Sequence, residues 1–304
     1  MSRIRPRSFL PALAAVVALL GAGCGDDGGQ PVSAGEGPAG DVVVLLVENV
    51  GGFLPAEVSY QMVPTLAVYG DGRVIEPGAQ ILVYPGPALP ALQQREVASE
   101  VLDAIEDAAR DAGLDRHDVD YGEPPVADAG DTVVTVVIDG ETYVHRATAL
   151  GLGAGTGSGL TDEQIDARTA LETYLALVQP IESLPGADQL SEAELFDADR
   201  YRLWVQPAVD VDTGSDVDTD DGSGPGAAGI APGPDDPTPT TALWTVDAIE
   251  LAESTCLGVE GAAATDLAAM LADANQLTRF DDGSQVWSVV ARPVLPHEPT
   301  CPEA

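Results

Sequence analysis

The 304-residue chain is strongly acidic, with 50 Asp and Glu against 13 basic residues and a formal net charge of −37. Every basic residue is Arg, which excludes Schiff-base and pyridoxal chemistry and the phosphate-binding loop that depends on a Lys. The charge also excludes nucleic-acid binding, because an acidic surface repels a phosphate backbone. Hydrophobic residues make up 45% of the chain, which is enough to build a folded core.

The N-terminus has the three regions of a bacterial export signal. Three Arg residues within the first seven positions precede an apolar run at 9–20, which is too short to cross a bilayer. The following LGAGC resembles the lipobox of bacterial lipoproteins, with Gly21 where Leu is usual. The resemblance implies cleavage of residues 1–23 and acylation of Cys24, for example by palmitate. The alternative is an ordinary secretory signal with a chance Cys at this place.

Residues 24–40 predict a flexible tether, because they show no apolar periodicity. By random-coil scaling, the residues after Cys24 hold the folded part about 20–25 Å from the lipid. The acidic chain would be repelled by anionic lipid. We therefore expect the acyl chains on Cys24 to supply the membrane attachment, on the outer side of the cytoplasmic membrane.

Residues 41–150 predict an N-terminal α+β unit. The run 42–47 is typical of a buried strand, and Asp-Gly pairs at 71–72 and 139–140 separate β-prone runs, as in tight hairpins. Apolar residues spaced by three and four over 97–112 predict a helix that ends at Gly113.

Residues 151–189 are expected to form a Gly-rich linker and a connecting helix, which begins at a Thr161–Gln164 capping box and ends before Pro180. The C-terminal α+β unit, 190–304, has strand patterns at 201–205, 243–249 and 286–291. An apolar helical stripe at 267–277 and a third Asp-Gly pair at 282–283 lie between them. Within this unit, residues 210–241 contain eight Asp and five Pro and predict a disordered acidic insertion. The paired strands and single helices together indicate an α+β fold with antiparallel sheets in two small units.

Two further stretches carry a resemblance. Residues 63–75 end in TLAVYGDGRVI, and residues 291–301 read ARPVLPHEPTC. Together with the lipobox, they resemble uncharacterised lipoproteins of high-GC Gram-positive bacteria. The resemblance implies an anchored extracytoplasmic protein and no particular activity.

Cys256 and Cys301 are the only cysteines that follow Cys24. Export places them in an oxidising compartment, so we expect them to form a disulfide. The alternative is a metal site shared with His297, but a closed zinc site needs four ligands.

The three tryptophans, Trp204, Trp244 and Trp287, all lie in strand-like runs of the C-terminal unit. We expect them to pack in the core, because the residues between them are also apolar. The alternative is a glycan-binding face built from the three indole rings.

The Asp-rich stretch matches part of a calcium-binding loop. Asp216, Asp218 and Asp220 stand at positions 1, 3 and 5, but Asp221 replaces the Gly of position 6 and Ala227 the Glu of position 12. The stretch is therefore interpreted as a solvated acidic loop with no metal.

No catalytic motif stands out. The chain has no G-x-S-x-G, and His117, His145 and His297 are isolated from nucleophile motifs. We expect a lipid-anchored extracytoplasmic binding or accessory protein, non-enzymatic and without a cofactor, whose partner is a protein or a glycan. The alternatives are a cell-envelope hydrolase that uses carboxylates and a glycan-binding module that uses the tryptophans.

Overall fold

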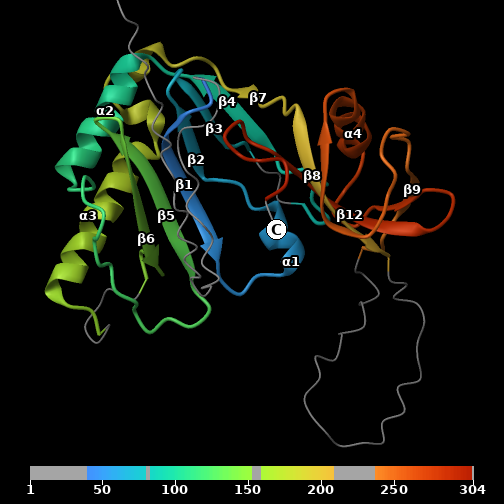
Figure 1. Cartoon of the computed structure of the whole chain (residues 1–304), viewed down its shortest axis with the longest axis horizontal. Coiled ribbons are helices and arrows are strands. Elements are labelled where there is room, and N and C mark those ends of the chain that lie inside the picture. The colour runs from blue at the N-terminus through green and yellow to red at the C-terminus, as the bar shows by residue number, and fades with distance from the viewer. Residues whose placement is uncertain (1–39, 80–82, 153–158, 209–236, 303–304) are drawn as a thin grey trace, which may run out of the picture. The chain divides into compact units, whose positions relative to one another are not determined.

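The structure is a computed structural model that describes residues 40–79, 83–152, 159–208 and 237–302. The signal region, Cys24 and most of the acidic insertion lie outside these residues. The described residues belong to one compact unit and form two sheets and four α-helices, so the predicted α+β class is confirmed (Figure 1). No helix in the described part combines the length and the apolarity that crossing a bilayer requires.

The first sheet has seven strands in the order β6-β5-β1-β2-β3-β4-β7, and neighbouring strands all run antiparallel. Its strands are β1 (Val43–Gly51), β2 (Leu66–Tyr69), β3 (Arg73–Pro77), β4 (Leu92–Glu96), β5 (Gly130–Ile138), β6 (Glu141–Thr148) and β7 (Glu194–Leu195). In β1, Leu45 and Leu46 point to opposite faces and both are buried. The continuous apolar run at 42–47 thus reflects a strand covered on both sides.

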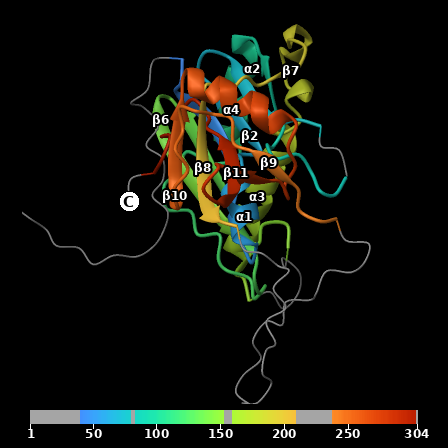
Figure 2. The same cartoon turned by 90° about the vertical axis from the view of Figure 1, so that its right-hand side faces the viewer.

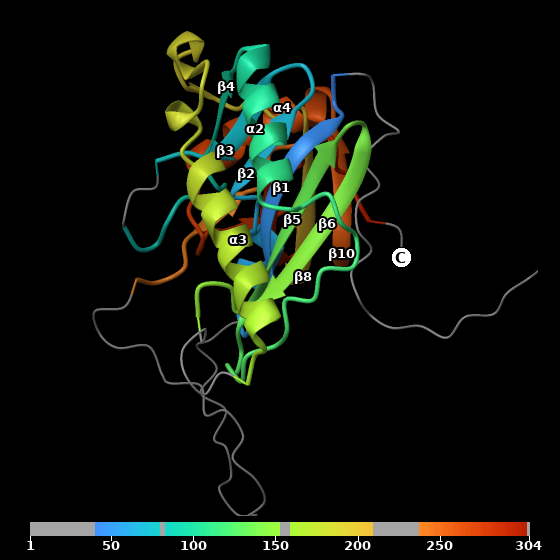
Figure 3. The same ribbon diagram turned by 90° about the vertical axis from the view of Figure 1, so that its left-hand side faces the viewer.

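Two helices, α2 (Ser99–Asp111) and α3 (Asp162–Val178), cover one face of this sheet (Figure 3). The capping box of Thr161 and Gln164 is present, and α3 ends before Pro180, as predicted. Instead of merely connecting two units, α3 packs its Leu171 and Tyr174 into the core of the first sheet. Short 3-10 turns follow at Ile181–Ser183 and Ala187–Gln189.

The predicted hairpins differ in their turns. Asp139 and Gly140 both adopt positive φ, as the tightest two-residue hairpin turn requires. At the first hairpin only Gly72 does so, and a Cβ there would lie 2.6 Å from the carbonyl oxygen of Val97. Gly72 is therefore required both for the turn and for the close approach of that backbone.

The second sheet has the order β10-β8-β12-β11-β9 and is accompanied by α4 (Ala262–Ala272) (Figure 2). Its strands are β8 (Arg200–Pro207), β9 (Thr241–Leu243), β10 (Ser254–Glu260), β11 (Arg279–Asp281) and β12 (Val286–Pro293). The pair β9–β11 is parallel, unlike the other pairs. The strand predicted at 243–249 is wrong beyond Leu243, because the Trp244 indole N–H donates to the carbonyls of Val246 and Ile249 and the chain turns there.

Two elements join the sheets. The six-residue helix α1 (Ala56–Gln61) buries none of its residues and is held by contacts with β12. The C-terminal tail returns to the first sheet, where Leu295 packs with Leu46 and Tyr69. The Arg292 guanidinium in β12 binds the Glu298 carboxylate through two hydrogen bonds of 2.7 Å, and its Nε donates to the carbonyl of Met62.

Candidate functional site

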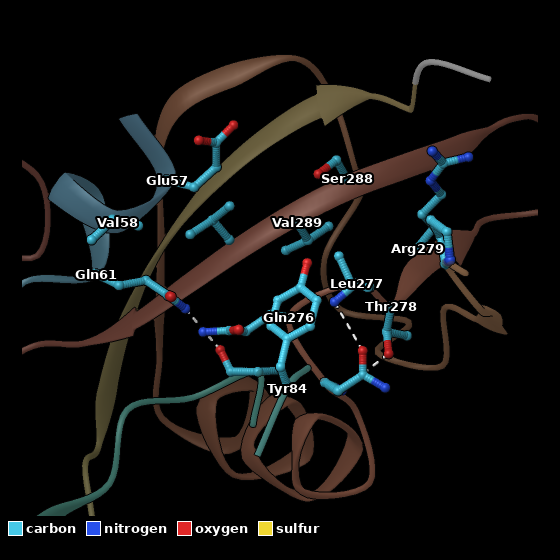
Figure 4. A pocket seen from close by; sticks show the side chains of 14 residues that line it. Glu57, Val58, Gln61, Tyr84, Gln276, Leu277, Thr278, Arg279, Ser288 and Val289 are labelled. Atoms are coloured by element: carbon cyan, nitrogen blue, oxygen red, sulfur yellow. Dashed lines mark hydrogen bonds between the residues drawn. The ribbon is translucent and has the colours of Figure 1, made fainter. Parts of the chain in front are cut away.

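A pocket of about 360 Å³ lies where α1 and residues 84–88 meet the second sheet and the α4–β11 connection (Figure 4). Its size falls at the small end of the range for ligand pockets. The bridge between Pro87 and Asn275 fixes one wall. The Gln276 N–H also donates to the Gly86 carbonyl, and the Gly86 N–H donates to the side-chain oxygen of Gln276. The two walls come from chain segments about 190 residues apart, so the pocket depends on the whole fold.

Three side-chain amides line this pocket, and each forms hydrogen bonds through only one end, its NH2 group or its oxygen. Gln61 donates through Nε2 to the carbonyls of Ala88 (2.9 Å) and Ala291 (3.2 Å), whereas Oε1 of Gln276 accepts from the Gly86 N–H. Asn275 accepts the N–H of Leu277 through Oδ1.

The opposite end of each amide has no partner within the described residues: an acceptor on Gln61, and donors on Gln276 and Asn275. These amides are held in place and still able to bind a ligand.

Hydroxyl and apolar groups complete the lining. The Tyr84 side chain is 71% exposed, and Val58 on α1 is 49% exposed. Ser288 on β12 also contributes a hydroxyl. An aromatic ring beside free amides and hydroxyls suits a neutral ligand that has one apolar side and several polar groups.

Two charged side chains stand on opposite sides of the pocket, Glu57 on α1 and Arg279 on β11 (Figure 4). Glu57 is the single carboxylate among the described lining residues. Glycoside hydrolysis uses two carboxyl groups, and the described lining supplies one of them.

Cys256 and Cys301 form a disulfide with a Cα–Cα distance of 5.9 Å, as the sequence predicts. Cys256 lies within β10 and not after a strand, and the bridge fastens the C-terminal tail to this edge strand. His297 is occupied elsewhere, because its Nδ1 is 2.8 Å from the hydroxyl of Tyr69. Among the described residues, no group of three or more His, Cys, Asp or Glu is placed to hold a metal ion.

The tryptophans are dispersed. Trp287 is buried in the second core, and its indole N–H donates to Asp282 at 2.7 Å. Trp244 is half-buried and packs edge to face against Phe280. The ring centroid of Trp204 lies 6.0 Å from that of Tyr60. Burial of Trp287 leaves no common exposed face for the three rings.

The remaining histidines are structural or superficial. His145 is 1% exposed, and its Nε2 donates to the Leu114 carbonyl, so its Nδ1 accepts from the Tyr121 hydroxyl. Burial lowers the pKa of His145 and raises that of Tyr121 to about 12. His117 is exposed, stacked on Tyr143 and hydrogen-bonded to Glu141.

A buried ionic cluster lies between the sheets around the Arg292–Glu298 pair. Burial by itself would raise the pKa of Glu298, but the hydrogen bonds and charge of Arg292 outweigh it and hold that pKa below its usual value. Burial, followed by the negative charge of Glu298, raises the pKa of Glu48 on β1. Arg202 lies 5.7 Å from the Tyr60 ring centroid, and burial lowers the pKa of its guanidinium. The cluster fastens the tail to β12.

Sequence reasoning missed the pocket residues Gln61, Asn275 and Gln276, because isolated amides carry no motif. The candidate calcium residues 216–227 lie outside the described residues. No protein-family model, curated protein or solved structure matches the chain.

Proposed function

We propose that the chain is a lipid-anchored extracytoplasmic protein that binds a ligand without transforming it. The export signal and Cys24 support the location, and the Cys256–Cys301 disulfide fits an oxidising compartment. The resemblance of residues 63–75 and 291–301 to lipobox-bearing lipoproteins points the same way.

One observation supports binding in particular: the pocket at α1 has three amides fixed by backbone contacts, each with an unused polar end. Preorganised donors and acceptors bind with little ordering cost. The lining is mainly uncharged, so the ligand is a neutral molecule rich in hydroxyl or amide groups.

A glycan fragment is the second candidate within this proposal, and Tyr84 favours it. Its exposed ring adjoins the free amides, and a sugar offers both an apolar face and hydroxyl groups to such a surface. A glycan site would then use Tyr84 in place of the three tryptophans. The hydrolase alternative would need a second carboxylate beside Glu57.

Calorimetric titration of the purified protein with two probes tests the proposal: N-acetylglucosamine oligomers and short uncharged peptides. Gln276→Leu should abolish binding of the active probe, because it removes both donors and the bond from Gly86. Gln189→Leu changes an exposed Gln outside the pocket lining and should leave binding intact.

Two results would contradict the proposal. One is that Gln276→Leu binds the active probe as tightly as Gln189→Leu does, and the other is that the unmodified protein hydrolyses the glycan probe. Failure of both probes to bind the unmodified protein would also contradict the neutral-ligand assignment.

A further inference from the structure

A second surface, separate from the amide pocket, exposes apolar side chains at the end of β1. We call it the Phe53 surface; it consists of Phe53, Leu54 and Leu152, which are 87%, 43% and 56% exposed. They border a hollow of about 320 Å³ that also reaches Met62. Full burial of a side chain as large as Phe is favourable by about 1.5–3 kcal/mol, and this fold forgoes that gain at Phe53.

The backbone that carries the Phe53 surface is held against a neighbouring segment. The N–H of Phe53 donates to the Asp128 carbonyl at 3.2 Å. Gly52 has φ +83, and a Cβ there would stand 3.3 Å from the backbone nitrogen of Gly130. The backbone of the loop that carries the exposed ring is therefore fixed by the neighbouring segment. Such a preformed surface loses little conformational entropy when a partner binds.

Charge decides among the possible occupants. An exposed carboxylate, Asp128, lines the hollow, and the whole chain carries −37. A second copy would bring the same charge and be repelled, whereas a basic partner would be attracted.

Charge also disfavours the membrane as the occupant. Anionic lipid headgroups would repel the acidic chain, as they would repel a second copy.

We infer that the Phe53 surface docks a segment of a partner protein in which apolar side chains are flanked by Lys or Arg. The apolar side chains fill the hollow beside Phe53 and Leu54, and a basic residue faces Asp128. This site shares no lining residue with the amide pocket.

The test places a photoreactive benzoylphenylalanine at position 53 of the full chain in the producing cells. A matched control places it at Leu195, which is 81% exposed on β7. Irradiation should give an adduct at position 53 and none at position 195. The cross-linked peptide should contain apolar residues next to Lys or Arg.

A synthetic peptide of the cross-linked segment then gives the affinity for the purified full chain. Phe53→Ser should weaken binding at least tenfold, and Leu195→Ser should leave it unchanged. Asp128→Asn should weaken binding mainly at low salt. Gln276→Leu should leave the adduct intact, which separates this surface from the amide pocket.

Four results would overturn the inference: an adduct with phospholipid, an adduct with a second copy of the chain, an adduct with a segment lacking basic residues, and no adduct beyond that at position 195.

Discussion

The pair of Arg292 and Glu298 provides the sharpest test of how the tail is held. Glu298→Gln keeps the shape of the side chain and removes its charge. The Glu298 carboxylate accepts two bonds from Arg292 and one from the Leu295 N–H, and the Arg292 side chain is only 3% exposed. The substitution thus leaves a buried cation without its counter-ion.

Breaking a buried ion pair from one side typically costs about 3–5 kcal/mol. Because Gln retains one acceptor oxygen, we expect about 3 kcal/mol, a large part of the roughly 5–15 kcal/mol that stabilises a typical domain. For a folded part of this size the melting temperature should fall by roughly 6–12 °C.

Denaturant unfolding of both proteins measures the difference directly. Glu192→Gln, at an exposed position, is the control. Replacing both partners, as Arg292→Met with Glu298→Leu, should cost less than Glu298→Gln alone, because no buried charge remains. A loss for Glu298→Gln no larger than that for Glu192→Gln would refute the reasoning.

Three further predictions concern stability. Replacing both Cys256 and Cys301 by Ser opens a loop with a sequence separation of 45 and should cost on the order of 4 kcal/mol in the chain-entropy model, measured by denaturant unfolding; an unchanged midpoint would contradict this. Burial lowers the pKa values of His145 and His297 from 6.5 in the folded state, so the unfolded state takes up protons at a higher pH. The contribution of the two neutral histidines to the free energy of unfolding is therefore complete above pH 6.5, and it is lost as the pH falls toward the folded pKa values. Unfolding at pH 7.5 and 5.5 should show this loss, and a variant with Gln at both histidines should show less of it. Replacing residues 212–238 by a short Gly-Ser linker should leave the melting temperature nearly unchanged, and a large drop would contradict the prediction of a dispensable segment.

Local sequence signals predicted much of the first sheet and its helices. The capping box at Thr161 and the Asp139-Gly140 turn are decided by neighbouring residues, so their patterns carry over directly. The disulfide also followed from residue counting, because export and two remaining cysteines leave one pairing.

Elements that depend on distant contacts escaped prediction. Helix α1 has six residues and no buried face, and its stability comes from Gln61 bonding to carbonyls far along the chain. The parallel pair β9–β11 brings together strands that are separated by β10 and α4. Amides such as Gln276 become pocket residues only through this packing, so no local pattern in the sequence identifies them.

The lipid anchor on Cys24 is tested most directly by measuring the mass of the N-terminal peptide of the mature protein. Mass spectrometry of protein from the membrane fraction should show a chain that begins at Cys24 and carries acyl chains on it. Cys24→Ala should move the protein out of that fraction. A mature chain that begins elsewhere, or a Cys24→Ala variant that remains membrane-bound after signal cleavage, would contradict the account.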